Sequence, residues 1–396
     1  MTTLVKNDQP FPLLHWTENE QACSARWRSE NGVSPPKRVV VADDTLTADS
    51  AYRLACEGTG ILWRGDFQNA RQLLQALARR ADRPAKKSGR KSTKPVPSMT
   101  ETFHLHRQAQ SQRSRTLGML LIGFDADHSV PLRRAPDVRL ACNEAYGRNE
   151  MPYVASMREL LGVISAHEWR KRGVEIAALS DDAPCRIHPH YGVFAPVRTD
   201  YVPLVAEAPL PATLQKNSLA FDIGTGTGVL AAVLAKRGIA RVVATDLDAR
   251  ALSCARENID RLDLRSQISL VEADLFPPGQ APLIVCNPPW VPARPSSPIE
   301  HAVFDPESRM LRGFLAGLAA HLTPDGEGWL VLSDLAEHLG LRSRSELLEW
   351  IDAAGLKVVA RIDARPTHAK AADPTDALHA ARAAEVTSLW RLGPRL

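Results

Sequence analysis

One stretch of the sequence decides the fold, and it reads Phe221-Asp222-Ile223-Gly224-Thr225-Gly226-Thr227-Gly228. The apolar residues at 219–223 predict a buried strand, and the apolar run at 229–237 predicts a helix. Glycine lets the backbone turn sharply between the two and lets a ligand approach the main chain closely. The free amide groups at the start of such a helix favour an anionic group. The stretch therefore predicts a strand–turn–helix unit whose turn holds a ligand, although nicotinamide enzymes use a similar turn.

From residue 218 onward, apolar runs alternate with amphipathic segments. We expect strands at 241–245, 268–271, 283–286, 328–333, 357–362 and 386–391, and helices at 249–262, 310–322 and 345–354. Strand–helix alternation with short connections predicts a parallel sheet with helices on both faces. The last two strands have no long helix between them, which predicts an antiparallel pair at one edge. The C-terminal half is therefore expected to be a Rossmann-like α/β domain with a seven-stranded sheet.

The N-terminal half gives weaker signals of mixed α/β structure. We expect helices at 48–56, 69–81, 102–121 and 157–172, and strands at 61–63, 174–179 and 187–194. Residues 83–98 are rich in Lys, Arg, Pro, Ser and Gly, which predicts a basic linker that is either a solvated loop or a phosphate-contacting arm. We expect two domains: an accessory or substrate-recognition region at 1–180 and a catalytic domain at 181–396.

Composition narrows the class of protein. The 396 residues are 44% hydrophobic and 24% charged, which is typical of a soluble globular protein. No apolar run is long enough to span a membrane, and the first ten residues do not resemble a secretory signal, so we expect a cytoplasmic protein without a membrane partner. The six scattered cysteines indicate reduced thiols. Cys185, His188 and His190 lack a second ligand group at zinc-site spacing, so we expect no metal.

Two acidic residues follow the second and third expected strands of the C-terminal half. Asp246 lies roughly 20 residues beyond the glycines, where a carboxylate can accept both hydroxyls of a ribose. The alternative role, a helix N-cap, suits Asp248 better. Asp274 could accept an adenine amino group while Leu275 packs on the ring, although a solvated strand end is the alternative.

The sequence Cys286-Asn287-Pro288-Pro289-Trp290 follows the fourth expected strand. Ligands of open α/β sheets bind outside the carboxyl ends of the strands. The two prolines fix the backbone and remove two donors, which leaves the Asn287 side-chain oxygen and the Pro288 carbonyl as acceptors. Trp290 adds a flat face. This pattern predicts a pocket for a planar –NH2 group, in which both acceptors strengthen their hydrogen bonds as the nitrogen becomes positive in the transition state.

These residues resemble the release-factor glutamine methyltransferases of the HemK type. That family reads Asp-x-Gly-Thr-Gly-Thr-Gly, an acid after each of the next two strands, and Asn-Pro-Pro-Tyr, and the resemblance covers roughly 191–335. It implies a class I methyltransferase fold with S-adenosylmethionine as cofactor. The residues implied to bind the cofactor are Asp222, Gly224, Thr225, Gly226, Thr227, Gly228, Asp246, Asp274, Leu275 and Asn287. The residues implied to be catalytic are Asn287, Pro288, Pro289 and Trp290.

The resemblance implies a macromolecular substrate, a protein glutamine amide ahead of RNA or DNA. Enzymes that methylate exocyclic amines of nucleic-acid bases share the Asn-Pro-Pro-aromatic motif, so an rRNA or DNA base is the alternative acceptor, and a non-catalytic cofactor-binding protein is a further one. Two features depart from the family. Trp290 replaces the tyrosine, which keeps a stacking ring and loses a hydroxyl, and the N-terminal region is far longer than the family's small helical domain.

Overall fold

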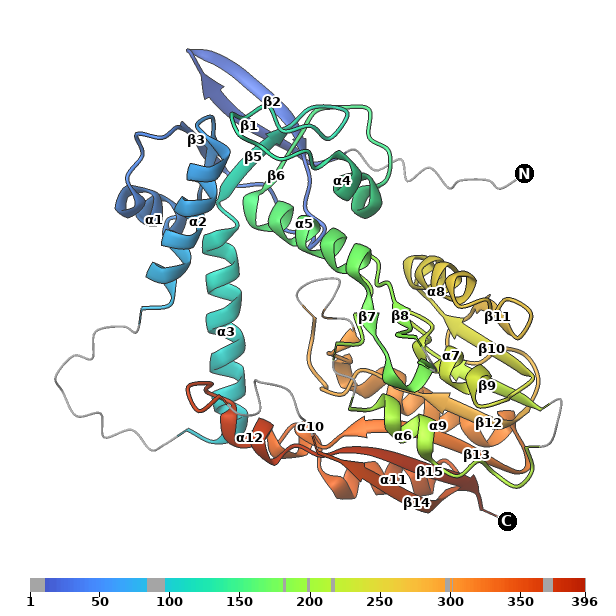
Figure 1. The fold of residues 1–396 in the computed structure, drawn as a ribbon. Coiled ribbons are helices and arrows are strands. Elements are labelled where there is room, and N and C mark those ends of the chain that lie inside the picture. Colours follow the sequence, from blue (N-terminus) through green and yellow to red (C-terminus); the bar gives the residue numbers. More distant parts are fainter. Residues whose placement is uncertain are drawn as a thin grey trace. The chain divides into compact units, whose positions relative to one another are not determined.

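The computed structural model describes residues 11–83, 97–180, 183–197, 200–214, 218–295, 300, 302–365 and 373–395. The chain forms two compact units: unit 1 comprises Met1–Lys94 and Arg107–His167, and unit 2 comprises Pro95–His106 and Glu168–Leu396 (Figure 1). Most of the basic segment at 83–98 lies outside the described residues. The domain boundary at 180 stays a prediction, because the two units divide at His167 and include a short earlier segment in unit 2.

A seven-stranded sheet forms the centre of unit 2, with the strand order β11-β10-β9-β12-β13-β15-β14. The strands are β9 (Leu219–Ile223), β10 (Arg241–Asp246), β11 (Ile268–Glu272), β12 (Ala281–Cys286), β13 (Leu322–Ser333), β14 (Leu356–Ala364) and β15 (Thr387–Pro394). The pairs from β11 to β13 are parallel, and β15 is antiparallel to both of its neighbours. This order and the single reversed strand confirm the expected class I methyltransferase topology.

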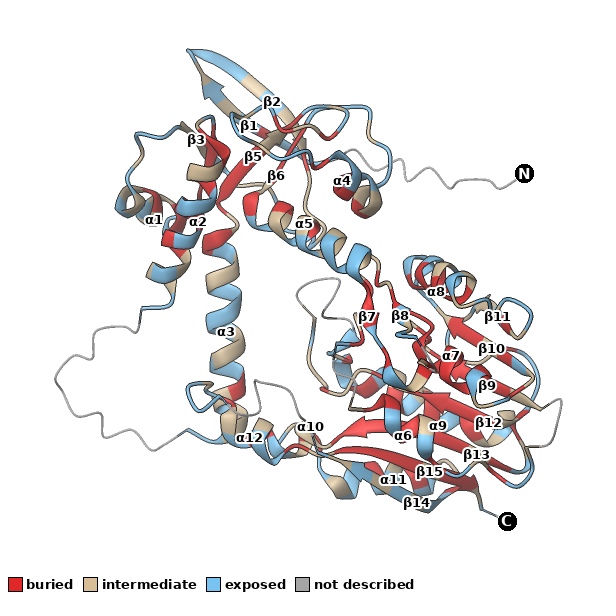
Figure 2. Cartoon of the chain, in the orientation of Figure 1, coloured by how far each residue is buried: buried red, intermediate tan, exposed pale blue. Residues whose placement is uncertain are grey.

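Helices cover both faces of this sheet (Figure 1). The helices are α6 (Val202–Glu207), α7 (Val229–Lys236), α8 (Ala249–Arg261), α9 (Arg309–His321), α10 (Leu335–His338), α11 (Arg344–Ala353) and α12 (His379–Ala384). Side chains alternate along β9, so that Ala220 packs with α6, α7 and α8, whereas Phe221 packs with α9 and α11. Figure 2 shows the resulting buried residues along the strands. The core of unit 2 therefore consists of two apolar layers, one on each face of the sheet.

The segment before this core contains less regular structure than the sequence predicts. The strands expected at 174–179 and 187–194 are limited to β7 (Val174–Glu175) and β8 (Arg186–Ile187), which pair antiparallel. A short 3-10 helix, Ala177–Leu179, follows β7. The apolar residues of this segment belong to the same buried cluster as α7, so their apolar pattern comes from packing in the core and not from longer strands.

Unit 1 contains a six-stranded sheet in the order β1-β2-β6-β5-β4-β3. Its strands are β1 (Leu13–Glu18), β2 (Gln21–Trp27), β3 (Arg38–Ala42), β4 (Thr59–Trp63), β5 (Leu120–Phe124) and β6 (Tyr153–Ser156). The helices α1 (Ala48–Cys56), α2 (Phe67–Ala81) and α4 (Arg139–Tyr146) belong to this unit, whereas α3 (Met99–Leu117) and α5 (Met157–Arg172) contain residues of both units. The expected mixed α/β character is confirmed. Within the described residues, no helix is long and apolar enough to cross a membrane.

Candidate active site

The glycine-rich turn after β9 adopts a conformation that depends on its glycines. Gly224, Gly226 and Gly228 have φ values of +72°, +55° and +83°, a region that side chains disfavour. The Thr225 amide donates to the Thr245 carbonyl at 2.8 Å, which fixes the turn to β10. Beyond Gly226 there is open space where a Cβ would stand. The main chain at this point is therefore accessible to a ligand, immediately before the start of α7.

Asp222 organises the turn from inside the core. Its side chain is buried, and its Oδ2 accepts from the Thr225 hydroxyl at 2.6 Å and from the Ala231 amide at 3.0 Å. Burial raises the pKa of Asp222 to about 6, against the lowering effect of these two hydrogen bonds. Asp222 also lines the cavity of the site, so the same residue fixes the turn and contributes its charge to the cavity.

Asp246 and Asp248 divide two roles at the end of β10. The Asp246 Oδ2 accepts from the Gly226 amide at 2.9 Å and its Oδ1 accepts from the Asp248 amide at 3.0 Å. Asp248 caps α8 by accepting from the Arg250 amide at 2.8 Å, as the sequence indicated. Burial raises the pKa of Asp246. Because a carboxylate oxygen can accept two hydrogen bonds, each oxygen of Asp246 retains capacity for a hydroxyl donor.

Asp274 and Leu275 lie at the end of β11 with partners that the sequence did not indicate. The Asp274 Oδ2 accepts from Arg309 Nη2 at 2.6 Å. Leu275 has a φ of +78°, and its carbonyl accepts from the Thr245 hydroxyl at 2.6 Å. Asp274 therefore already contacts a guanidinium, and its role toward an adenine amino group stays a prediction.

The Asn287–Trp290 segment leaves β12 and turns back on itself. The Trp290 Nε1–H donates to the Asn287 Oδ1 at 2.9 Å. The Trp290 carbonyl accepts a longer hydrogen bond, 3.5 Å, from Nη1 of the buried Arg342. Val291 continues into a bridge with Phe304, and the Val291 carbonyl accepts from the Asp305 amide at 2.9 Å. Contacts with Arg342 and Asp305 therefore hold the motif in place. The sequence did not predict the hydrogen bond between Trp290 and Asn287.

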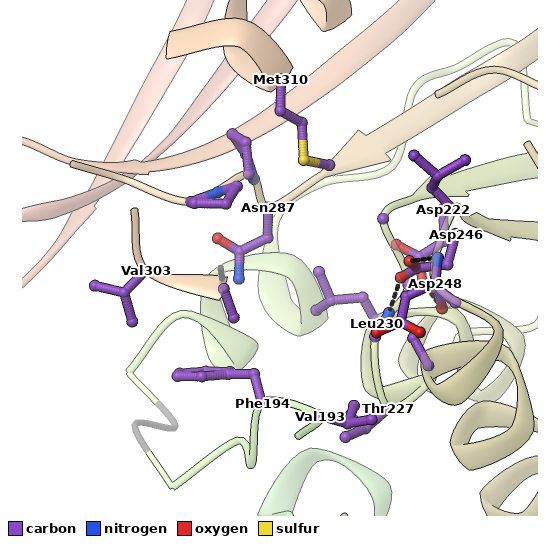
Figure 3. A pocket seen from close by; sticks show the side chains of 18 of the residues that line it. Val193, Phe194, Asp222, Thr227, Leu230, Asp246, Asp248, Asn287, Val303 and Met310 are labelled. Carbon is purple, nitrogen blue, oxygen red and sulfur yellow. Dashed lines mark hydrogen bonds between the residues drawn. The ribbon is translucent and has the colours of Figure 1, made fainter. Parts of the chain in front are cut away.

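A cavity of about 390 Å³ brings these segments together (Figure 3). All of the predicted site residues except Gly228 line it. Sequence reasoning missed several further lining residues, namely Val193, Phe194, Leu230, Val303, Arg309 and Met310. Figure 3 shows the Asn287 carboxamide projecting into the space that Phe194 and Val303 border, with Asp222 and Asp246 on the other side of Leu230. Gly228 instead packs its backbone closely against Ala255 of α8.

Asn258 ties the glycine turn to the segment that precedes the core. It is buried, and its Oδ1 accepts from the His188 amide at 2.7 Å. Its Nδ2 donates to the Thr227 carbonyl at 3.1 Å and to the His188 carbonyl at 3.2 Å. His188 and His190 also have other partners: a ring nitrogen of His188 contacts the Arg170 carbonyl, and His190 pairs with Glu257. Within the part of the chain that the structure describes, no three acidic, His or Cys side chains form a metal-binding group.

Comparisons with known proteins show which families this chain is similar to. The family model described as methyltransferase small domain matches residues 184–348. The release factor glutamine methyltransferase of Cereibacter sphaeroides is 37% identical over 144 residues, which cover 35% of this chain and 48% of that protein. The tRNA1(Val) (adenine(37)-N6)-methyltransferase of a Shewanella species is 32% identical over 174 residues, covering 41% of this chain and 71% of that protein.

Among solved structures, a methyltransferase from Pyrococcus furiosus is 19% identical with a TM-score of 0.37, covering 58% of this chain and 96% of that one. This chain spans about half the length of the glutamine methyltransferase and somewhat over two thirds of the length of the tRNA methyltransferase. The match to the tRNA methyltransferase, the family model and the strand order of unit 2 together show the family of this chain. The chain belongs to the class I S-adenosylmethionine-dependent methyltransferases, in the methyltransferase small domain family.

Proposed function

We propose that this chain is an N-methyltransferase that acts on a planar –NH2 nitrogen, with a protein glutamine side chain as the first candidate acceptor. The observation that carries the proposal is the position of the Asn287 carboxamide, which shares one cavity with the glycine turn and Asp246. The glutamine methyltransferase named above supports the choice of acceptor. The six free cysteines support a reducing cytoplasm as its location.

The residues around the cavity fit S-adenosylmethionine. The open space beside Gly226 lets the carboxylate of the cofactor approach the start of α7, where the amides of a helix N-terminus favour an anion. Asp246 has acceptor capacity for two ribose hydroxyls, and Leu275 offers an apolar contact for the adenine ring. When bound, the cofactor supplies a methyl group whose bond to sulfur breaks, with the electron pair left on sulfur, as the acceptor nitrogen attacks.

The chain's own residues promote this attack by orienting and polarising the acceptor. An amide nitrogen is a poor nucleophile because its lone pair is delocalised. The Asn287 oxygen and the Pro288 carbonyl accept from its two N–H groups, and these hydrogen bonds strengthen as the nitrogen gains positive charge. Trp290 supplies an aromatic face beside them. The surplus proton leaves to water after transfer, so no strong base is required.

The second candidate acceptor is the exocyclic amine of a nucleic-acid base. The specific observation in its favour is that Phe194, Val303 and Trp290 all line the cavity that contains Asn287, and such flat or apolar walls suit a stacked base. The adenine methyltransferase named above aligns over more of its own length than the glutamine methyltransferase does. The two candidates share the same –NH2 chemistry and differ in the molecule that carries it.

The test is methyl transfer into an extract from a strain that lacks this protein. The protein and radiolabelled S-adenosylmethionine are added, and the products are treated separately with protease, with ribonuclease and with deoxyribonuclease. We expect protease-sensitive label that appears as methylated glutamine after enzymatic hydrolysis. Label that is sensitive to either nuclease would favour the second candidate instead. Equal labelling by the wild type and by Asn287→Ala, or no labelling of either fraction, would contradict an –NH2 methyltransferase of either kind.

A further inference from the structure

The side chain of Trp290 is fixed in place by its surroundings. It packs at the edge of three apolar clusters of unit 2: one with α7, one with α9, and one formed by residues such as Val291 and Leu339. Its carbonyl accepts from the buried Arg342. The indole Nε1–H is therefore a donor whose position does not depend on the substrate, and it points at the Asn287 Oδ1 at 2.9 Å.

A fixed donor at this point determines which way the Asn287 amide faces. The last torsion of an asparagine side chain has a broad, two-fold preference, so rotation exchanges its oxygen and its –NH2 at little cost. In the flipped orientation the –NH2 of Asn287 would meet the indole N–H, and two donors would face each other. The observed hydrogen bond therefore selects the orientation that turns the oxygen toward Trp290.

The selected orientation is the one that an –NH2 substrate requires. An amide oxygen has two lone pairs, of which the indole uses one and leaves the second for a substrate N–H. The flipped amide would instead present N–H groups to the substrate's own N–H groups. Because the oxygen must be in place before positive charge develops on the substrate nitrogen, its orientation affects the rate of transfer.

We propose that Trp290 is a positioning residue that acts through Asn287, in addition to presenting an aromatic face to the substrate. This inference rests on the proposed function and deepens it. The tyrosine that the HemK-type motif carries at this position has no ring N–H, so the hydrogen bond is a property of the tryptophan in this chain. The proposal applies to either candidate acceptor, since both present –NH2.

The test is a double-mutant cycle between Trp290→Phe and Asn287→Ala, measured as single-turnover methyl transfer with saturating cofactor. The substrate is the protein or nucleic-acid fraction, from a strain lacking this protein, that the wild type labels. Trp290→Phe keeps a ring and removes the donor, so we expect its rate to fall about fivefold, as for the loss of one neutral hydrogen bond. In the Asn287→Ala background the same change should have no further effect, because the partner is already absent. A fivefold loss in both backgrounds would show a stacking role alone and overturn the proposal, as would an unchanged rate in Trp290→Phe.

A second measurement is independent of activity. Hydrogen exchange of the Trp290 indole proton, assigned by its loss in Trp290→Phe, should be slow in the wild type and faster in Asn287→Ala. Equal exchange in the two proteins would overturn the hydrogen bond. If the wild type transfers no methyl group to either fraction, the proposed function fails, whereas a difference in indole exchange would still show that Trp290 orients Asn287.

Discussion

The buried charge of Asp222 predicts a stability that falls as the pH rises. Its carboxyl group is almost fully buried beneath the glycine turn, and burial raises its pKa from 3.8 to about 6. Well below pH 4 the group is protonated in both the folded and the unfolded chain. Between pH 4 and pH 6 the unfolded chain releases its proton first, so the stabilisation from this group is lost as the pH rises through 6. The shift corresponds to about 3 kcal/mol of unfolding free energy.

The substitution Asp222→Asn should remove this dependence. Asparagine keeps an oxygen for the Thr225 hydroxyl and the Ala231 amide but cannot ionise. We expect the unliganded variant to be more stable than the wild type at pH 8, by up to about 3 kcal/mol, and nearly equal to it at pH 4. The cationic cofactor favours an ionised neighbour, so its affinity for the wild type should increase as the pH rises through 6, and its affinity for the variant should stay level.

Urea unfolding from pH 4 to pH 8 measures the first expectation, and titration calorimetry measures the second. Asp248→Asn is the matched control, because it makes the same change of residue at an exposed helix cap after β10. A stability difference between the wild type and Asp222→Asn that is constant from pH 4 to pH 8 would refute the reasoning. It would mean that the carboxylate is as well stabilised in the fold as in water.

Three further substitutions test separate parts of the site. Asn287→Ala should lower single-turnover methyl transfer about a hundredfold, much more than it lowers cofactor affinity, because it removes an acceptor that matters most in the transition state; near-normal turnover would disprove its catalytic role. Asp246→Ala should weaken S-adenosylmethionine binding by about 2 kcal/mol or more in calorimetry, and NAD should not bind; unchanged affinity would exclude the ribose role. Asn258→Ala should lower the unfolding free energy by about 3 kcal/mol, since three hydrogen bonds of this buried side chain are lost. A thermal melt that matches the wild type would show that these bonds are not important for stability.

The central strands of unit 2 could be predicted because both of their faces are buried. Strands in the middle of a parallel sheet are covered on both faces, so they appear in the sequence as short apolar runs, and β9, β10 and β12 lie within two residues of the expected ranges. The strand β13 begins six residues before the expected start at 328, because its first part is Leu322-Thr-Pro-Asp-Gly-Glu, which looks like a turn. The residue types at 322–327 favour a turn, but pairing with β12 makes this segment part of the strand.

Unit 1 was predicted less well for identifiable reasons. The expected helix at 102–121 ends at Leu117, and the apolar residues that follow form β5, because a short apolar run fits a helix and a buried strand equally well. The hairpin of β1 and β2 turns at Asn19 and Glu20, which both have positive φ. Such turns are usually recognised by a glycine, and none is present here. These elements therefore lacked the local signals on which sequence reasoning depends.

The order of strands explains why four separate motifs form one site. The glycine turn, Asp246, Asp274 and Asn287 follow β9, β10, β11 and β12, and these strands are neighbours that run in the same direction. The chain continues from β9 to β10 on one side and from β12 to β13 on the other, and a crevice forms between β9 and β12, where the direction changes. Cofactor residues after β9 and β10 thus face Asn287 across the crevice. Local sequence predicts each motif, but the bond between Trp290 and Asn287 depends on how three apolar clusters pack around the indole, which only the folded chain determines.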